Sequence, residues 1–297
     1  MDKRILVTGP TGKVGSQVIK YLKRKDNVEI IAGVHHLNDA DRFESQGIKI
    51  VEFELDDPET IENALSITDR LFLLTPMTPD MERRVQNVVE QTRNNKVEFI
   101  VRLSFYGASD ENPVRLGELH RKADQVVINS GIPYTILRPN SFMQNFSEYY
   151  ADSIREMDTF YLAQGDGKIS YIDTRDIGNV AATILAEPTR ENINQIYTLT
   201  GSQALDNFEV ADIFSRVMGR QIKYVNISKE EMSQYMRQQK MPDWIIDIMM
   251  EYQDYIKKNM ATRVTGRVVE LTGMPPYTFR EFSRDYKEQF EKQPVKV

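Results

Sequence analysis

Residues 8–15, with the sequence TGPTGKVG, decide the fold predicted for this chain of 297 residues. They follow the apolar run at residues 5–7 and precede residues whose apolar side chains recur at helical spacing. Gly9 can leave a strand through a tight turn, and Gly12 carries no Cβ that would keep a pyrophosphate from the backbone. Gly15 lets the helix pack close to the sheet. The pattern predicts a strand, a glycine turn and a helix whose first N–H groups face the phosphates of a dinucleotide.

A loop that cradles a nucleoside triphosphate is excluded by the same residues. Such a loop needs four residues between its glycines and a serine or threonine after the lysine. Here two residues separate Gly9 from Gly12, and Val14 follows the lysine. A strand-to-helix turn that binds no ligand stays the alternative to a dinucleotide site.

The composition excludes several other classes of function. The net charge of −6, from 38 basic and 44 acidic residues, argues against binding to a nucleic-acid backbone. The chain has no cysteine, which excludes disulfides, thiolate nucleophiles and iron–sulfur clusters. No apolar run is long enough to cross a bilayer, and the first residues lack the apolar stretch of a signal peptide. We therefore expect a cytoplasmic protein without membrane or nucleic-acid partners, either a monomer or a homodimer.

Strand-like and helix-like segments alternate through the first half of the chain. Strands are expected at 28–34, 48–53, 71–74, from 99 and at 134–137, with helical periodicity between them at 81–89 and 119–127. This order predicts an α/β fold with a doubly wound, mostly parallel sheet of the Rossmann type. In such a sheet ligands gather at the carboxyl ends of the strands.

The second half changes character without a flexible linker. We expect a dinucleotide-binding domain at residues 1–141 and a smaller, mainly helical substrate lobe at 142–297, some of whose strands return to the sheet. A strand is predicted at 169–172, and Asp176 is the expected cap of the next helix. Three further helix starts are predicted by the capping-box spacing of Asp206 with Glu209, Ser228 with Glu231 and Thr278 with Glu281.

The end of the second strand indicates which nicotinamide cofactor is bound. A site selective for NAD usually carries a carboxylate there, whereas this chain has Gly33-Val34-His35-His36. Either imidazole, or Lys13, can donate to a 2′-phosphate, so NADP(H) is favoured over NAD(H). The alternative is that both histidines are solvated loop residues. Adjacent histidines are poorly spaced for a metal, and no metal site is expected.

Residues 54–58 follow the third strand, where they can meet the adenine. Glu54 and Leu55 are the expected contacts, and Asp56 or Asp57 can instead cap the next helix.

Five segments together resemble the NmrA-like branch of the atypical short-chain dehydrogenases/reductases. They are TGPTGKVG at 8–15, ELDDPET at 54–60, IPYTILRPNSFMQNF at 132–146, GDGKISYIDTRDIGNVAATIL at 165–185 and LTGMPPYTFREF at 271–282. The branch includes NADPH-dependent quinone reductases and a triphenylmethane dye reductase. The resemblance implies a Rossmann fold and a smaller carboxyl-terminal lobe that closes over the nicotinamide. Members often carry arginine where this chain has His35.

The resemblance also implies a set of cofactor contacts. The expected pyrophosphate contacts are Gly9, Thr11, Gly12, Lys13 and Val14. Those beside the nicotinamide ribose are Thr75, Pro76, Met77 and Ser104. Those flanking the ring are Pro139, Asn140, Ser141 and Phe142.

The usual catalytic pair of short-chain dehydrogenases, Tyr-x-x-x-Lys, is missing from its expected helix. The one such spacing, Tyr21 with Lys25, lies on the first helix, away from the carboxyl edge, and is expected on its surface. Without a positioned acid a ketone is a poor acceptor, whereas a quinone or a cationic dye can take hydride first. We therefore expect an NAD(P)H-dependent oxidoreductase that reduces a quinone-like or other electrophilic aromatic acceptor.

Aromatic residues near the predicted nicotinamide site can hold such an acceptor. The candidates are Phe105, Tyr106, Phe142, Met143 and Phe146, with Tyr106 or His120 as the proton donor. The alternative for each is a place in the core between the lobes. A second possible function is a redox-sensing or regulatory protein that binds NAD(P) with little or no turnover. An epimerase needs the missing tyrosine, and a serine hydrolase needs a GxSxG motif that does not occur.

Overall fold

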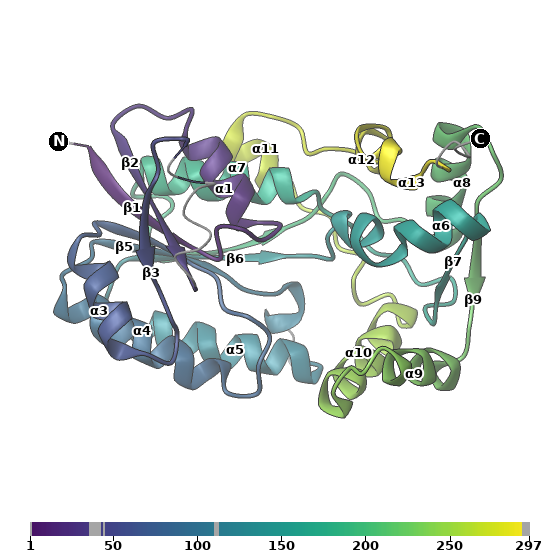
Figure 1. Cartoon of the computed structure of the whole chain (residues 1–297), viewed down its shortest axis with the longest axis horizontal. Helices are drawn as coiled ribbons and strands as arrows, with labels where there is room; N and C mark the ends of the chain where they lie inside the picture. Colours follow the sequence, from purple (N-terminus) through teal and green to yellow (C-terminus); the bar gives the residue numbers. More distant parts are fainter. Residues whose placement is uncertain (1, 36–42, 44, 110–112, 293–297) are drawn as a thin grey trace.

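The computed structural model describes residues 2–35, 43, 45–109 and 113–292, so His36 lies outside the described residues. Its main sheet is parallel throughout, in the order β3-β2-β1-β4-β5-β6-β8 (Figure 1). The strands are β1 Lys3–Thr8, β2 Val28–Val34, β3 Lys49–Glu52, β4 Arg70–Leu73, β5 Phe99–Leu103, β6 Tyr134–Pro139 and β8 Gln195–Leu199. The order reverses direction at β1 and β4, which confirms the predicted doubly wound Rossmann-type fold.

Helices cover both faces of this sheet (Figure 1). One face carries α1 Gly15–Leu22, α7 Thr174–Ala186 and α11 Arg267–Thr272, and the other carries α3 Pro58–Ser66, α4 Met81–Asn94 and α5 Arg115–Ile128. The strand side chains alternate between the two layers: Ile5 and Val7 pack in one core, whereas Leu6 packs in the other. Burial on both faces explains the apolar runs of the inner strands, such as residues 5–7 of β1 and 71–73 of β4.

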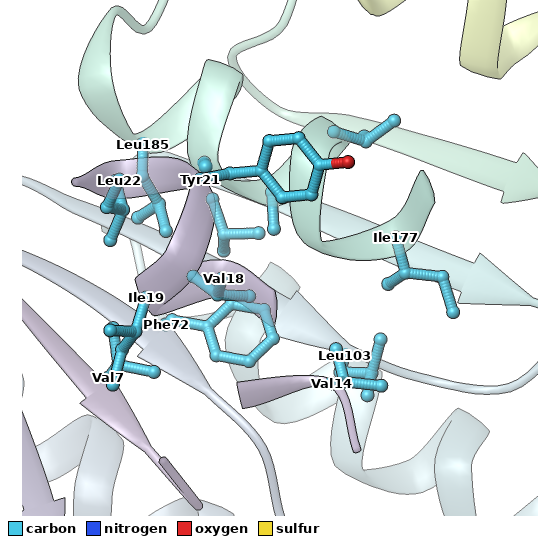
Figure 2. Packing of buried hydrophobic residues seen from close by; sticks show 14 of the residues in the cluster. Val7, Val14, Val18, Ile19, Tyr21, Leu22, Phe72, Leu103, Ile177 and Leu185 are labelled. Atoms are coloured by element: carbon cyan, nitrogen blue, oxygen red, sulfur yellow. The ribbon is translucent and has the colours of Figure 1, made fainter. Parts of the chain in front are cut away.

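Helices α1 and α7 lie unusually close together. A Cβ on Gly178 of α7 would stand 2.5 Å from the Cβ of Gln17 on α1, so this contact requires glycine. Tyr21 is 9% exposed in the same interface, which makes the expectation of a surface position for it wrong. Figure 2 shows it near the end of α1, beside α7.

A second, smaller part of the chain lies beyond the end of β6 (Figure 1). It contains the π-helical turn η3 Phe146–Tyr150, α6 Ala151–Met157, α8 Asn207–Met218, α9 Lys229–Gln238, α10 Asp243–Lys257, α12 Phe279–Asp285 and α13 Lys287–Phe290. It also contains a two-stranded parallel sheet of β7 Thr159–Leu162 and β9 Lys223–Asn226. Its core is aromatic, with Phe146 at the centre of contacts to Phe160, Phe214 and Phe279.

The local predictions for this half have mixed outcomes. All three capping boxes are present with both of their hydrogen bonds, which confirms those helix starts. The predicted strand at 169–172 is wrong: Ile172 makes an isolated parallel bridge with Phe142, and Ile169 an antiparallel one with Leu205. Because the two bridges have different partners and directions, no ladder forms.

The predicted cap of α7 is also wrong. Asp173 caps the helix by accepting from the N–H of Arg175 at 2.9 Å. Asp176 lies one turn inside and accepts the N–H of Tyr277 at 3.0 Å, so it anchors the segment before α12 instead.

Asp176 makes the stability of the protein depend on pH. Burial, together with the Asp173 carboxylate, raises the pKa of Asp176 to about 7. The native state therefore holds this proton more tightly than the unfolded chain, and stability falls as pH rises from about 4 to 7. Between pH 5 and pH 8, the free energy of unfolding of Asp176→Asn should therefore fall by roughly 2–3 kcal/mol less than that of the wild-type protein. Urea unfolding of both proteins at the two pH values measures it, and equal falls would contradict it.

Candidate active site

The glycine turn lies at the carboxyl edge of the sheet, between β1 and α1. Gly9 has a φ of +60°, and its carbonyl accepts the N–H of Gly12 at 3.1 Å. A Cβ on Gly15 would stand 2.1 Å from the Gly9 oxygen, so Gly15 closes the turn itself. A Cβ on Gly12 would meet only that oxygen, at 3.4 Å, and both Gly12 and Thr11 are exposed. The turn therefore presents bare backbone at the place predicted for the pyrophosphate.

The two residues after Gly12 face opposite ways. Val14 is 2% exposed and packs in the core under α1, so only its backbone can meet a phosphate. Lys13 reaches toward the lobe, where it pairs with Glu148 and donates to Asn145 Oδ1 at 3.1 Å. Burial lowers the pKa of Lys13 to about 8. Lys13 thus links the turn to the lobe, beside a hollow of about 370 Å³ that reaches Tyr286.

The adenosine end of the predicted site carries a pair that the sequence did not indicate. The imidazole of His35, at the end of β2, contacts the carboxylate of Glu54, which follows β3. The His35 side chain is 67% exposed. Leu55 is buried, and Asp57 caps α3. A carboxylate therefore stands next to the residue expected to receive a 2′-phosphate.

A buried charged cluster lies at the end of the site predicted for the nicotinamide. Asp124 of α5 accepts from Arg102 Nε at 2.9 Å, from Arg138 Nη2 at 2.9 Å and from the Ser104 hydroxyl at 2.8 Å. Arg102 also donates to the Thr75 hydroxyl at 3.4 Å. The cluster holds two cations and one carboxylate, and Arg102 and Asp124 are fully buried. It fixes the predicted ribose contacts Thr75 and Ser104, whereas Pro76 is exposed and Met77 half-buried.

The loop after β6 is fixed by Asn140. This side chain is 1% exposed, donates to Ser170 Oγ at 2.8 Å and to the Ala261 carbonyl at 2.9 Å, and accepts the N–H of Ser141 at 2.8 Å. The loop therefore joins the sheet to the lobe at a defined position. The Ser141 hydroxyl lies 2.7 Å from that of Tyr252 on α10.

Phe105, which follows β5, contacts side chains of both α10 and α5. Its ring lies 5.5 Å from that of Tyr252, edge to face, and 5.8 Å from that of His120. Burial, with Arg102 and Arg138 nearby, lowers the pKa of His120 to about 3, so the imidazole is neutral at physiological pH. Its Nδ1 is buried and has no hydrogen-bond partner among the residues that the structure describes.

The other predicted acceptor contacts are less accessible. Tyr106, in the turn η2 Tyr106–Ser109, is 7% exposed, and its hydroxyl accepts the N–H of Arg263 at 3.3 Å. Met143 and Phe146 are each 2% exposed in the aromatic core of the lobe. Phe142 is half-buried beside β6.

Sequence reasoning did not identify Arg102, Arg138 or Tyr252 as site residues. A charged side chain inside the apolar strand at 99–103 was a signal for Arg102. Tyr252 lies 111 residues from Ser141, and its helical spacing indicates only a core position.

Bare backbone at a strand–helix turn on the carboxyl edge of a parallel sheet defines a dinucleotide-binding protein of the Rossmann type. The chain belongs to the NmrA-like family, whose sequence model matches residues 1–282. This confirms the resemblance found in the sequence.

Relatives and solved structures of this family cover nearly the whole chain. The NAD(P)H azoreductase of Xenophilus azovorans is 34% identical over 96% of this chain and 99% of its own. The NADPH-dependent quinone oxidoreductase of Escherichia coli, solved with NADPH, has a TM-score of 0.85 at 25% identity and covers 97% of this chain and 100% of its own. The triphenylmethane reductase of Citrobacter sp. shares the fold, with a TM-score of 0.83 at 24% identity, over 96% of this chain and 99% of its own. None of the described helices is long and apolar enough to cross a membrane.

Proposed function

We propose that this protein is an NAD(P)H-dependent reductase of quinone-like or other electrophilic aromatic acceptors. The observation that carries the proposal is the exposed backbone of the glycine turn, on the same sheet edge as Thr75, Ser104 and Ser141, which come after β4, β5 and β6. The whole-length similarity to an NAD(P)H azoreductase and to a quinone oxidoreductase supports it. Residues 1–141 bind the cofactor and 142–297 supply the substrate lobe, except that α7, β8 and α11 belong to the sheet layers.

The site residues act by positioning and by excluding water. Bound NAD(P)H supplies a hydride. Gly12 and the first N–H groups of α1 hold the pyrophosphate, and Thr75 and Ser104 hold the ribose at a place fixed by the buried Asp124 cluster. The acceptor lies against Phe105 and Phe142, and Met143 and Phe146 belong to the buried cluster on which Phe105 packs. A neutral His120 can donate or accept one hydrogen bond without carrying charge.

The cofactor preference that we propose is NADP(H) over NAD(H). It is supported by the absence of a carboxylate at the end of β2 and by the NADPH bound in the solved quinone oxidoreductase. Glu54 opposes it, because a 2′-phosphate has to compete with this carboxylate for His35.

Removing the Glu54 charge is therefore expected to strengthen the preference. We expect Glu54→Gln to raise the ratio of NADPH affinity to NADH affinity about tenfold, since the imidazole then meets the phosphate without a competing anion. Fluorescence titration with both cofactors measures the ratio. The matched control is Asp56→Asn, a neighbouring exposed carboxylate paired with Arg83 and Arg84, which should leave the ratio unchanged. An unchanged ratio in Glu54→Gln would contradict the assignment of His35.

The function is tested by cofactor oxidation with a panel of quinones, azo dyes and cationic dyes, beside a direct cofactor titration. The proposal expects turnover with at least one electrophilic acceptor. Tight cofactor binding with no turnover on any acceptor would overturn it and would favour a regulator that senses NAD(P).

A further inference from the structure

The hydroxyl groups of Tyr252 and Ser141 have a defined direction of donation. They lie 2.7 Å apart, and either can donate on distance alone. Tyr252 is 9% exposed, and no second hydrogen-bond partner for its hydroxyl stands among the described residues. If Ser141 donated, the tyrosine proton would be buried without an acceptor, which is unfavourable. Tyr252 therefore donates to Ser141.

This direction leaves the Ser141 proton free to point elsewhere. Ser141 is only partly buried, and its backbone is held by its own N–H to Asn140 and by its carbonyl to Ile172. The ring of Phe105 packs edge to face on that of Tyr252 and also lies against that of His120. The serine hydroxyl is thus a fixed donor at the carboxyl edge of the sheet. It lies near the Phe105 ring, against which we place the acceptor. Burial raises the pKa of Tyr252 to about 12, so the phenol keeps its proton at any working pH.

We propose that Ser141 donates to the acceptor oxygen during reduction and that Tyr252 is the positioning residue that aims it, in place of the missing Tyr-x-x-x-Lys pair. The inference rests on the proposed function. Two-electron reduction of a quinone adds one hydride from the reduced cofactor, which becomes oxidised, and leaves an oxygen anion that takes one proton from solvent. A hydroxyl aimed at that oxygen stabilises the charge as it forms. A cationic triarylmethane dye takes the same hydride at carbon, becomes neutral and needs neither proton nor donor.

A comparison of quinone and dye therefore distinguishes hydrogen-bond donation by Ser141 from a purely structural role of this residue. We expect Ser141→Ala to lower kcat with a quinone about a hundredfold, and Tyr252→Phe about tenfold, because the serine donor remains but is no longer aimed. With a cationic dye that the wild-type protein reduces, both variants should stay within about twofold of wild type. The control is Tyr235→Phe, an exposed tyrosine on the neighbouring helix α9, which should change neither rate.

The outcomes of this experiment are distinct. Equal losses with quinone and dye in both variants, or no loss with quinone, would overturn the inference and leave the reductase standing. No turnover by the wild-type protein with any acceptor would overturn the proposed function itself. Thermal melting of each variant, expected to match wild type, excludes misfolding as the cause. NADPH titration of each variant gives the concentration that saturates it, and kcat with both acceptors is compared at that concentration.

Discussion

Replacing Asp124 with asparagine should lower the free energy of unfolding by about 3–5 kcal/mol. Asp124 is the carboxylate between the guanidinium groups of Arg102 and Arg138, and it is completely buried. Without its charge, two cations stay in the interior with no counterion, and the Ser104 hydroxyl keeps only a weaker acceptor. Denaturant unfolding of both proteins measures the loss.

Two comparisons show whether the effect comes from the charge balance. Arg102→Met should be less damaging than Asp124→Asn, because it leaves Arg138 and Asp124 as a neutral pair. Glu118→Gln removes a carboxylate from the exposed ion pairs of the same helix and should change stability by less than about 1 kcal/mol. Equal stability of Asp124→Asn and Glu118→Gln would refute the assigned role of the cluster.

The largest expected effects on cofactor binding come from the glycine turn. Gly15→Ala puts a Cβ 2.1 Å from the Gly9 oxygen, so the backbone of the turn must move. We expect roughly 3 kcal/mol of lost stability and loss of measurable NADPH binding. Gly12→Ala meets only an ordinary contact at 3.4 Å, so the protein should fold with stability within about 1 kcal/mol of wild type.

Gly12→Ala is therefore the more informative variant. Its methyl group would stand where the pyrophosphate approaches the backbone, and the Kd for NADPH should rise between about tenfold and a hundredfold. Isothermal titration beside a thermal melt gives both quantities. If affinity stayed at the wild-type value, the phosphates would have to bind elsewhere.

Local sequence patterns predict most of the fold. Residues 8–15 and the alternating strands and helices predict the parallel sheet, because strand–turn–helix order and handedness leave few arrangements. The capping boxes, such as Asp206 with Glu209, are correct because each forms within one turn of helix.

The predictions fail where a contact joins residues that are far apart in the sequence. The sequence allows either Asp173 or Asp176 to cap α7. In the structure Asp173 caps the helix, and Asp176 instead accepts the backbone N–H of Tyr277, which is distant in sequence. The His35 contact with Glu54 joins loops after two different strands. Tyr252 contacts Ser141 only because α10 packs at the carboxyl edge of the sheet. No spacing in the sequence predicts that contact.

The most direct measurement of the central claim is a single-turnover experiment, in which the protein loaded with NADPH is mixed rapidly with a quinone. The absorbance of the reduced nicotinamide should fall in one phase, more slowly when deuterium replaces the transferred hydrogen at C4. Gly12→Ala should show the same phase only at higher cofactor concentration. Bound NADPH that keeps its absorbance with every quinone, azo dye and cationic dye would contradict a reductase and leave a protein that binds the cofactor without using it.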